Sequence, residues 1–175
     1  MGDPKKQRKK YKTPMHPFSK DRLHSELILM GKYGLRNKRE IWRATTTLRG
    51  LRKHARHSLA LPDEEQEKAR SLLVGKLNRL GILTPNSTLD DVLRLNIEDI
   101  LNRRLQTIVQ KQGLSNSIYH ARQLIIHGHI AVSGRRITSP GYLVDREDEN
   151  TVSFAPSSPL SDPNHPARIK ASVQE

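Results

Sequence analysis

Residues 120–137 read HARQLIIHGHIAVSGRRI, and this stretch predicts the passage from a helix into a β-hairpin. Apolar residues recur at helical spacing through its first half, and Gly128 is typical of the residue at which a helix ends. The second half has two short segments around a Ser-Gly loop, which predicts a hairpin with Ile130 opposite Ile137. Because histidine and arginine are concentrated here, three interpretations are open: a metal or acid-base site, a polyanion-binding surface, or an ordinary helix and hairpin.

A metal site would need ligands that the sequence does not group together. His127 and His129 are possible ligands, but the chain has no cysteine and the nearest acidic residue in sequence is Asp145. His120 lies one helical turn earlier and projects at a different angle. We therefore expect no metal and no cofactor, and we expect the histidines to form hydrogen bonds or to pack at the end of the helix.

Catalysis has no positive evidence in the sequence. The carboxylate pairs Asp90-Asp91 and Glu98-Asp99 stand at predicted helix starts, where capping and the helix dipole explain them. No P-loop, GxGxxG or GxSxG motif occurs. We therefore expect a protein that is not an enzyme and that has no small-molecule substrate.

The distribution of charge favours a polyanion as the partner. The chain of 175 residues has a formal net charge of +13 and a pI near 10.3. Residues 1–62 carry +13, residues 63–102 carry −3 and residues 103–175 carry +3. Because the excess lies in the first third, we expect that part to make most of the contact with nucleic acid. The alternative is a solvated basic arm with no fixed partner.

Other features of the composition narrow the class of protein. No segment resembles a membrane span or a secretory signal, which favours a cytoplasmic protein with no membrane partner. The absence of cysteine agrees with this and excludes a disulfide framework. Aromatic residues are only 4% of the chain, which argues against base stacking and favours recognition of the shape and backbone of folded RNA.

The pattern of apolar residues predicts an α+β fold with a mainly helical N-terminal region. Capping residues, glycines and prolines predict helices at about 19–34, 37–61, 63–80 and 89–95. Residues 96–113 predict one further continuous helix, because their apolar residues keep helical spacing as far as a terminal glycine.

The chain after residue 113 predicts a small α/β unit. Ser115 or Ser117 can cap a helix with a core side of Ile118, Ala121, Leu124 and Ile125. The hairpin follows, and short strands at 142–144 and 151–154 complete a small antiparallel sheet. From Ala155 onward the sequence predicts a loose tail.

The candidate RNA-binding residues are basic side chains in the N-terminal arm, in the predicted second helix with the turn before it, and in the predicted α/β unit. Arginine provides both charge and a bidentate fork for phosphate. In chain order these residues are Lys5, Lys6, Arg8, Lys9, Lys10, Lys12, Arg36, Lys38, Arg39, Arg43, Arg49, Arg52, Lys53, Arg56, Arg103, Arg104, Arg122, Arg135 and Arg136. If the helices pack on each other, the arginines of the α/β unit converge on one side; the alternative is a solvated face.

Four motifs closely resemble the S-four RNA-binding domain. They are ArgArgLeuGlnThr at 103–107, GlyLeuSer at 113–115, AlaArgGlnLeuIle at 121–125 and HisGlyHisIle at 127–130. That domain is an α-α-β module of ribosomal proteins, pseudouridine synthases and tyrosyl-tRNA synthetases. TyrGlyLeuArgAsnLysArgGluIleTrpArg at 33–43 and IleGluAsp at 97–99 resemble, more specifically, the family of small-subunit ribosomal protein number four in its archaeal and eukaryotic branch.

The resemblance implies a structural constituent of the small ribosomal subunit. Such a protein binds a helix junction in the 5′ domain of the ribosomal RNA early in assembly, contributes to the messenger RNA entry region and to translational accuracy, and neighbours ribosomal protein number five. By position, the resemblance implies RNA contacts from Arg104, Arg122, Gln123, His127, His129 and Arg135. The alternatives are an RNA-modifying enzyme that shares the domain and a nonspecific nucleic-acid-binding protein.

The resemblance also implies the domain boundaries. We expect a basic extension ordered on RNA at 1–18, a helical domain at 19–100, the S-four domain at 101–156 and a flexible tail at 157–175. Two departures from the family pattern affect the predicted interface. Ser133 stands in the hairpin turn where Asn is usual, and Asn116 and Tyr119 stand where relatives are often basic.

Overall fold

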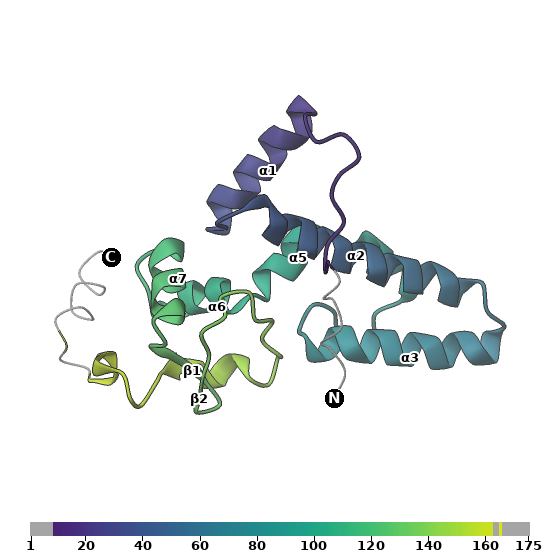
Figure 1. The fold of residues 1–175 in the computed structure, drawn as a ribbon. Helices are drawn as coiled ribbons and strands as arrows, with labels where there is room; N and C mark the ends of the chain where they lie inside the picture. Colours follow the sequence, from purple (N-terminus) through teal and green to yellow (C-terminus); the bar gives the residue numbers. More distant parts are fainter. Residues whose placement is uncertain (1–8, 163–164, 166–175) are drawn as a thin grey trace, which may run out of the picture.

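The structure, a computed structural model, describes residues 9–162 and residue 165. Within these residues the chain forms two lobes joined end to end, with α1 projecting from the start of α2 (Figure 1). The helices are α1 (Lys20–Lys32), α2 (Lys38–Leu59), α3 (Asp63–Arg79), α4 (Leu89–Arg94), α5 (Ile97–Asn102), α6 (Leu105–Lys111) and α7 (Ile118–Ile126). The strands are β1 (Ile130–Val132), β2 (Arg135–Arg136) and β3 (Ser153–Phe154). The predicted α+β class is confirmed.

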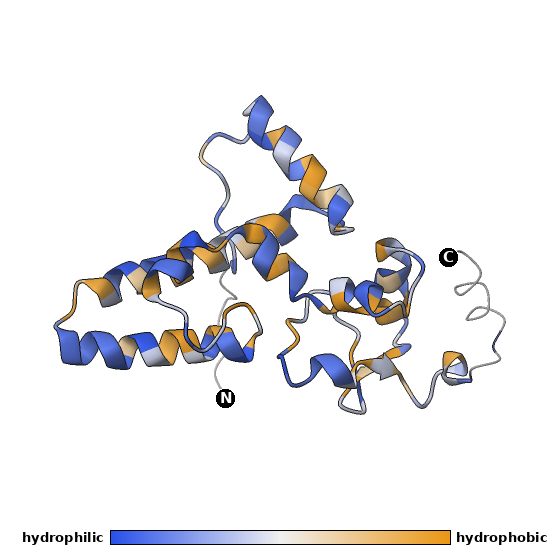
Figure 2. Ribbon diagram, turned by 180° about the vertical axis from the view of Figure 1, so that it is seen from behind, coloured by the Kyte–Doolittle hydropathy of each residue, from blue (hydrophilic) through white to orange (hydrophobic). Residues whose placement is uncertain are grey.

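The N-terminal lobe, residues 20–102, has a core of its own between α2, α3, α4 and α5. Ala55, Leu77, Val92 and Leu101 are fully buried in it. Hydrophilic residues predominate along α2 and α3, in keeping with a narrow apolar stripe on each helix (Figure 2). The four helices predicted for this region are confirmed, with ends that differ by a few residues from those predicted.

Polar contacts at Glu26 and at the end of α1 hold this helix to the rest of the lobe. Glu26 is buried; it accepts a hydrogen bond from Trp42 Nε1 at 3.0 Å and pairs with Lys38 at 3.4 Å. Tyr33 donates from its hydroxyl to Glu98 Oε2 at 3.1 Å. Burial, and then the hydrogen bond to Glu98, raise the pKa of Tyr33 to about 12, so this donor stays protonated. Together the contacts fix the chain reversal that follows α1.

The C-terminal lobe, residues 105–162, packs α6 and α7 against a three-stranded antiparallel sheet of order β2-β1-β3. Ile108, Ile130 and Val144 are buried at its centre. The predicted core side of α7, from Ile118 to Ile125, is buried as expected, and Ser117 caps the helix by accepting from His120 N at 3.1 Å.

The single helix predicted at 96–113 is wrong, because the chain leaves the helix at Arg104. This residue has extended dihedral angles (φ −72°, ψ 140°) and forms an isolated antiparallel bridge with Leu143. Leu105 N donates to Tyr142 O at 2.8 Å, and Val144 N donates to Arg103 O at 3.0 Å. Backbone pairing with a distant segment thus replaces the helical hydrogen bonds, while the apolar spacing continues on both sides of the break.

The hairpin has the predicted register. Ala131 pairs with Arg136, and Ile137 N donates to Ile130 O at 3.1 Å. Both turn residues have positive φ, 49° at Ser133 and 75° at Gly134, as a two-residue turn of the favoured type requires. The Ser133 hydroxyl donates to Asp148 Oδ1 at 2.7 Å, which offsets the cost of a left-handed serine.

The segments after the hairpin differ from the prediction. Residues 142–144 contribute the isolated bridge at Leu143 rather than a strand, and Glu149–Thr151 is a 3₁₀ turn that leaves only Ser153–Phe154 as β3. The loose tail predicted from Ala155 is wrong for its first part. Ala155 and Leu160 are buried, and a second 3₁₀ turn lies at Pro159–Ser161. Most of the predicted tail, residues 163–164 and 166–175, lies outside the described residues.

The part of the N-terminal arm that the structure describes contacts the first half of α2. The Tyr11 ring lies 6.0 Å from that of Trp42, and Lys12 N donates to Thr46 Oγ1 at 3.0 Å. The arm residues Lys5, Lys6 and Arg8 fall outside the described residues. Across the described part of the chain, no helix is both long and apolar enough to cross a bilayer.

Candidate nucleic-acid interface

Helix α2 presents a row of basic side chains to solvent. Its buried residues, Ile41, Ala44, Leu48, Ala55 and Ser58, occupy one side of the helical repeat, which leaves the residues between them on the outside. The exposed basic residues of α2, here called the α2 basic face, are Arg39, Arg43, Arg49, Lys53 and Arg56. Among the residues that the structure describes, none of these five forms an ion pair. Their charges are available to an external anion.

One part of this helix lines a groove. Arg49, Arg52 and Arg56 lie three and four residues apart, on the same side of α2, and line a space of about 340 Å³ with Asn96 and Ile97 on its other wall. Arg52 is half-buried and donates from Nη2 to Leu95 O at 2.6 Å. The groove therefore has one fixed guanidinium between two that project freely.

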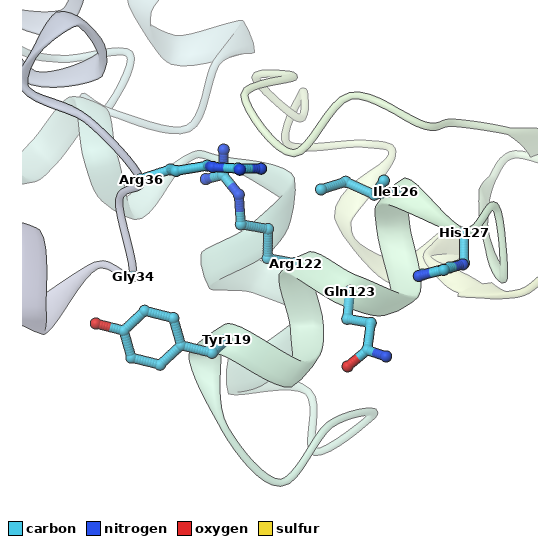
Figure 3. Close-up of a pocket in the computed structure, with 7 residues that line it drawn as sticks. All are labelled: Gly34, Arg36, Tyr119, Arg122, Gln123, Ile126 and His127. Carbon is cyan, nitrogen blue, oxygen red and sulfur yellow. The ribbon is translucent and has the colours of Figure 1, made fainter.

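A second cavity lies where the two lobes meet, beside α7. It has a volume of about 410 Å³ and is lined from the N-terminal lobe by Gly34 and Arg36. Tyr119 and Arg122 line it from α7, together with Gln123, Ile126 and His127 (Figure 3). Tyr119 is 60% exposed. The cavity thus combines an aromatic ring, two guanidinium groups and a carboxamide.

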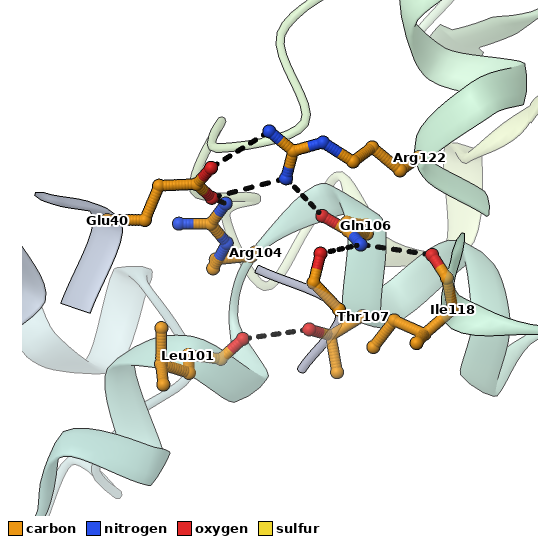
Figure 4. Close-up of polar contacts among 8 residues, drawn as sticks. Glu40, Leu101, Arg104, Gln106, Thr107, Ile118 and Arg122 are labelled. Atoms are coloured by element: carbon orange, nitrogen blue, oxygen red, sulfur yellow. Dashed lines mark hydrogen bonds and ion pairs between the residues drawn. The ribbon is translucent and has the colours of Figure 1, made fainter. Parts of the chain in front are cut away.

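The lobes are joined by a polar network around Glu40 (Figure 4). Arg122 donates from Nη2 to Glu40 Oε1 at 2.8 Å, and Arg104 donates from Nη2 to Glu40 Oε2. Gln106 is fully buried; its Nε2 donates to Gly34 O and to Ile118 O, both at 3.0 Å, and its Oε1 accepts from Arg122 at 3.3 Å. Helix α2 is therefore bonded directly to α7 and to Arg104, the residue before α6.

The charges of this network are unequal, since two guanidinium groups face one carboxylate. Burial raises the pKa of Glu40, but the hydrogen bond from Arg122 and the charges of Arg104 and Arg122 outweigh it and hold the pKa below its ordinary value. Burial and then the charges of Arg122 and Arg43 lower the pKa of Arg104, against the opposing effect of Glu40. Glu40 is therefore ionised at neutral pH, and the cluster keeps a net positive charge.

The candidate residues named from the sequence differ in their exposure. Those exposed to solvent are Lys9, Lys10, Lys12, Arg36, Arg39, Arg43, Arg49, Lys53, Arg56, Gln123, His127, Arg135 and Arg136. Those half-buried are Lys38, Arg52, Arg103, Arg122 and His129, and Arg104 is buried. Contact of any of them with RNA stays a prediction.

The arginines expected to converge on one side do so only in part. Arg104 and Arg122 meet at Glu40, whereas Arg103 pairs with Glu149 at 2.7 Å and donates to Val144 O at 3.1 Å. All three guanidinium groups thus have intramolecular partners. The geometry favours a structural contribution from them, in contrast to the free side chains of the α2 basic face.

The histidines lie at the end of α7. His129 Nδ1 is 2.8 Å from Ser158 Oγ, a hydrogen bond of the kind the sequence favoured. The His127 ring stacks with that of His129 at 6.3 Å and is exposed. Within the described residues, no group of three or more His, Cys, Asp or Glu side chains is arranged to hold a metal ion.

Sequence reasoning did not identify Glu40 or Gln106 as important. A signal for Glu40 was present, because it is the one acidic residue between Asn37 and Pro62 in a strongly basic stretch. Gln106 gave no such signal, since a glutamine in an apolar helix is equally compatible with an exposed position.

Comparison with known proteins connects both lobes to one family. The model described as "Ribosomal protein S4/S9 N-terminal domain" matches residues 4–102, and the model described as "S4 domain" matches residues 103–150. A protein of Ignicoccus hospitalis named "Small ribosomal subunit protein uS4" is 58% identical over 159 residues, which cover 91% of this chain and 96% of that protein. A protein of the same name from Hyperthermus butylicus is 55% identical over 175 residues, covering 100% of this chain and 97% of the relative.

Proposed function

The chain belongs to the uS4 family of small-subunit ribosomal proteins, and from this we propose that it is a structural constituent of the small ribosomal subunit that binds ribosomal RNA. The observation that carries the RNA-binding part is the α2 basic face, whose charges have no partner within the described residues. A row of free cations on a rigid helix suits the regular spacing of phosphates.

The geometry supports recognition of backbone and shape. Helix α2 has 22 residues. At the usual rise it is about 33 Å long, enough to follow several phosphates along an RNA helix. Lys12 of the basic arm contacts the same helix, and the exposed Lys9 and Lys10 precede it in the chain and add to the positive charge of the arm. Binding would release counterions from the RNA and would depend strongly on salt.

From the resemblance to the family we also propose a more specific role in the ribosome. In this role the protein binds a helix junction in the 5′ domain of the ribosomal RNA early in assembly. It then contributes to the messenger RNA entry region and to translational accuracy, next to ribosomal protein number five, in cytoplasmic ribosomes. Two lobes held at a fixed angle suit a junction, because each lobe can contact a different RNA helix. The role is structural rather than catalytic.

The test is a titration of the full chain with a 5′ domain fragment of small-subunit ribosomal RNA at two salt concentrations. About six phosphate contacts predict an affinity on the order of a thousandfold weaker at 200 mM than at 50 mM salt. Arg49→Ala with Arg56→Ala should reduce the slope of this dependence. Lys68→Ala with Lys76→Ala removes the same charge from exposed positions of α3 and should leave the slope unchanged.

Two results would contradict the proposal. A flat salt response would show that the α2 basic face does not hold phosphates. Equal affinity for duplex DNA and for the RNA fragment at matched salt would favour the alternative of a nonspecific nucleic-acid-binding protein. Turnover of ribosomal RNA uridines by the purified chain would favour the modifying enzyme.

A further inference from the structure

We propose that the cavity beside α7 binds a single unpaired nucleotide that is extruded from the bound RNA, with its base stacked on Tyr119. The inference rests on the proposed RNA-binding function and adds a base-binding site to the backbone recognition described above. The ligand is one nucleobase with its attached phosphate.

The shape and apolar surface of the cavity suit a base. Its volume of about 410 Å³ lies within the usual range of about 300–1,000 Å³ for ligand sites. Tyr119 and Ile126 are 60% and 47% exposed, so the apolar part of the cavity is open to a ligand. Figure 3 shows the Arg122 side chain between the Tyr119 ring and the Ile126 side chain, with Arg36 beside the Arg122 guanidinium group. A base stacked on Tyr119 would cover the exposed ring.

The polar groups of the cavity are free to bind. Within residues 9–162, no hydrogen-bond or ion-pair partner is present for the Arg36 guanidinium, the Gln123 carboxamide or the Tyr119 hydroxyl. A carboxamide offers a donor and an acceptor side by side, which matches the edge of a base. A free guanidinium suits the phosphate that enters with it.

The wall of the cavity is already in place. Arg122 is held by Glu40 at 2.8 Å and by Gln106 at 3.3 Å. Because this side chain is already ordered, binding loses little conformational entropy here. Gly34 brings the turn after α1 against α7, and this turn carries Arg36 to the cavity. The site therefore needs both lobes, and it is positively charged before any RNA arrives.

Paired RNA does not fit this chemistry. In a duplex the faces of the bases are covered by their neighbours, and a side-chain ring can stack only on a base that has left the helix. An apolar protein side chain would fill the apolar part but would leave the Arg36 guanidinium without an anion. An unpaired nucleotide supplies both the aromatic face and the negative charge.

The test uses the full chain and two RNA hairpins with the same stem, one fully paired and one with a single bulged 2-aminopurine nucleotide. We expect the bulged hairpin to bind roughly tenfold more tightly, with a change in 2-aminopurine fluorescence as the base stacks. Tyr119→Ala should remove both the preference and the fluorescence change, and Tyr119→Phe should keep them. Tyr142→Ala is the matched control, because this tyrosine is exposed but lies outside the cavity.

The outcomes separate this inference from the function on which it rests. Equal affinity of the native chain for the two hairpins, with salt-dependent binding to both, would overturn the nucleotide site and leave RNA binding intact. A preference that survives Tyr119→Ala would also overturn it, since the bulge would then be recognised elsewhere. Absence of binding to either hairpin and to the ribosomal RNA fragment would overturn the proposed function and the inference with it.

Discussion

At the scale of single residues, Glu40 decides how the two lobes are joined. Its side chain is 17% exposed and pairs with both Arg104 and Arg122. Neither arginine can lose its proton in a protein, so each needs a counter-charge once it is partly buried. Removal of the carboxylate would leave two guanidinium groups facing each other at the junction.

We predict that Glu40→Gln lowers the free energy of unfolding by about 3 kcal/mol at neutral pH, because it leaves the two arginines without a counter-charge. The pKa of Glu40 is lowered in the folded state, so the ion pairs stabilise the protein fully above the ordinary pKa of a glutamate. The stabilisation is lost as the pH falls through the lowered pKa. Urea unfolding of the native chain and the variant from pH 7 to about pH 3 should show the difference between them shrinking.

The control for this prediction is Glu67→Gln. Glu67 is 71% exposed in its ion pair with Arg70, and an exposed pair contributes at most about 1 kcal/mol. If Glu40→Gln lowers the free energy of unfolding no more than Glu67→Gln does, the network does not stabilise the fold through its charge. The same conclusion would follow if the effect of Glu40→Gln stayed constant with pH.

The sequence predicted the residue types of the candidate site better than their roles. Arg122 and Arg135 are both arginines of the stretch 120–137. Arg122 nevertheless pairs with Glu40, whereas Arg135 is exposed to solvent. Glu40 is 82 residues away from Arg122 in the chain. No local pattern encodes such a pairing, so the distinction between a structural and a free arginine required the fold.

At the scale of elements, local signals predicted most helices and failed where a distant segment intervenes. The hairpin at 130–137 follows from its own sequence, because a two-residue turn fixes the register. The break in the helix at Arg104 depends on pairing with Leu143. The apolar residues of 96–113 keep helical spacing across the break and therefore do not predict it. Periodicity identifies the buried face of an element but not the hydrogen bonds of its backbone.

The turn between α1 and α2 provides a prediction at this scale. Gly34 has φ +56°, and a Cβ at this position would lie 2.7 Å from Gln106 Nε2 and 2.8 Å from Ile118 Cγ2. Gly34→Ala therefore combines a left-handed conformation with a clash against the other lobe, and we expect it to lower the melting temperature clearly. Gly113→Ala is the matched control, because Gly113 has φ +71° but nothing within 4 Å of the added Cβ.

The conformational cost alone is about 1–2 kcal/mol and should be common to both variants. The additional loss in Gly34→Ala measures the contact between the lobes. Equal melting temperatures for the two variants would mean that the turn moves away from Gln106 without cost.

At the scale of the whole molecule, the chain has two hydrophobic cores and two polar connections between them. One is the network around Glu40, and the other joins α3 to the C-terminal lobe, where Arg146 N donates to Arg79 O at 2.7 Å and Arg79 pairs with Asp145 at 3.3 Å. The cores lie in different lobes and share no buried residue. Gln106 donates to Gly34 O across the junction, and its bonds with Ile118 and Arg122 join α6 to α7 beside it. Separate cores favour separate unfolding, while buried hydrogen bonds between the lobes favour a single cooperative unit. The polar connections therefore decide whether the RNA meets one rigid body or two.

We predict that Gln106→Ala uncouples the lobes, because it removes the hydrogen bond to Gly34 O across the junction and the bond from Arg122, which itself pairs with Glu40 of the other lobe. Hydrogen exchange measured along a urea series should show the amides of α2 to α5 and those of α6 and α7 losing protection together in the native chain. In the variant the two sets should lose protection at different urea concentrations. Gln110→Ala, an exposed position one turn later on α6, should behave as the native chain, and a concerted loss in Gln106→Ala would place the coupling in another contact.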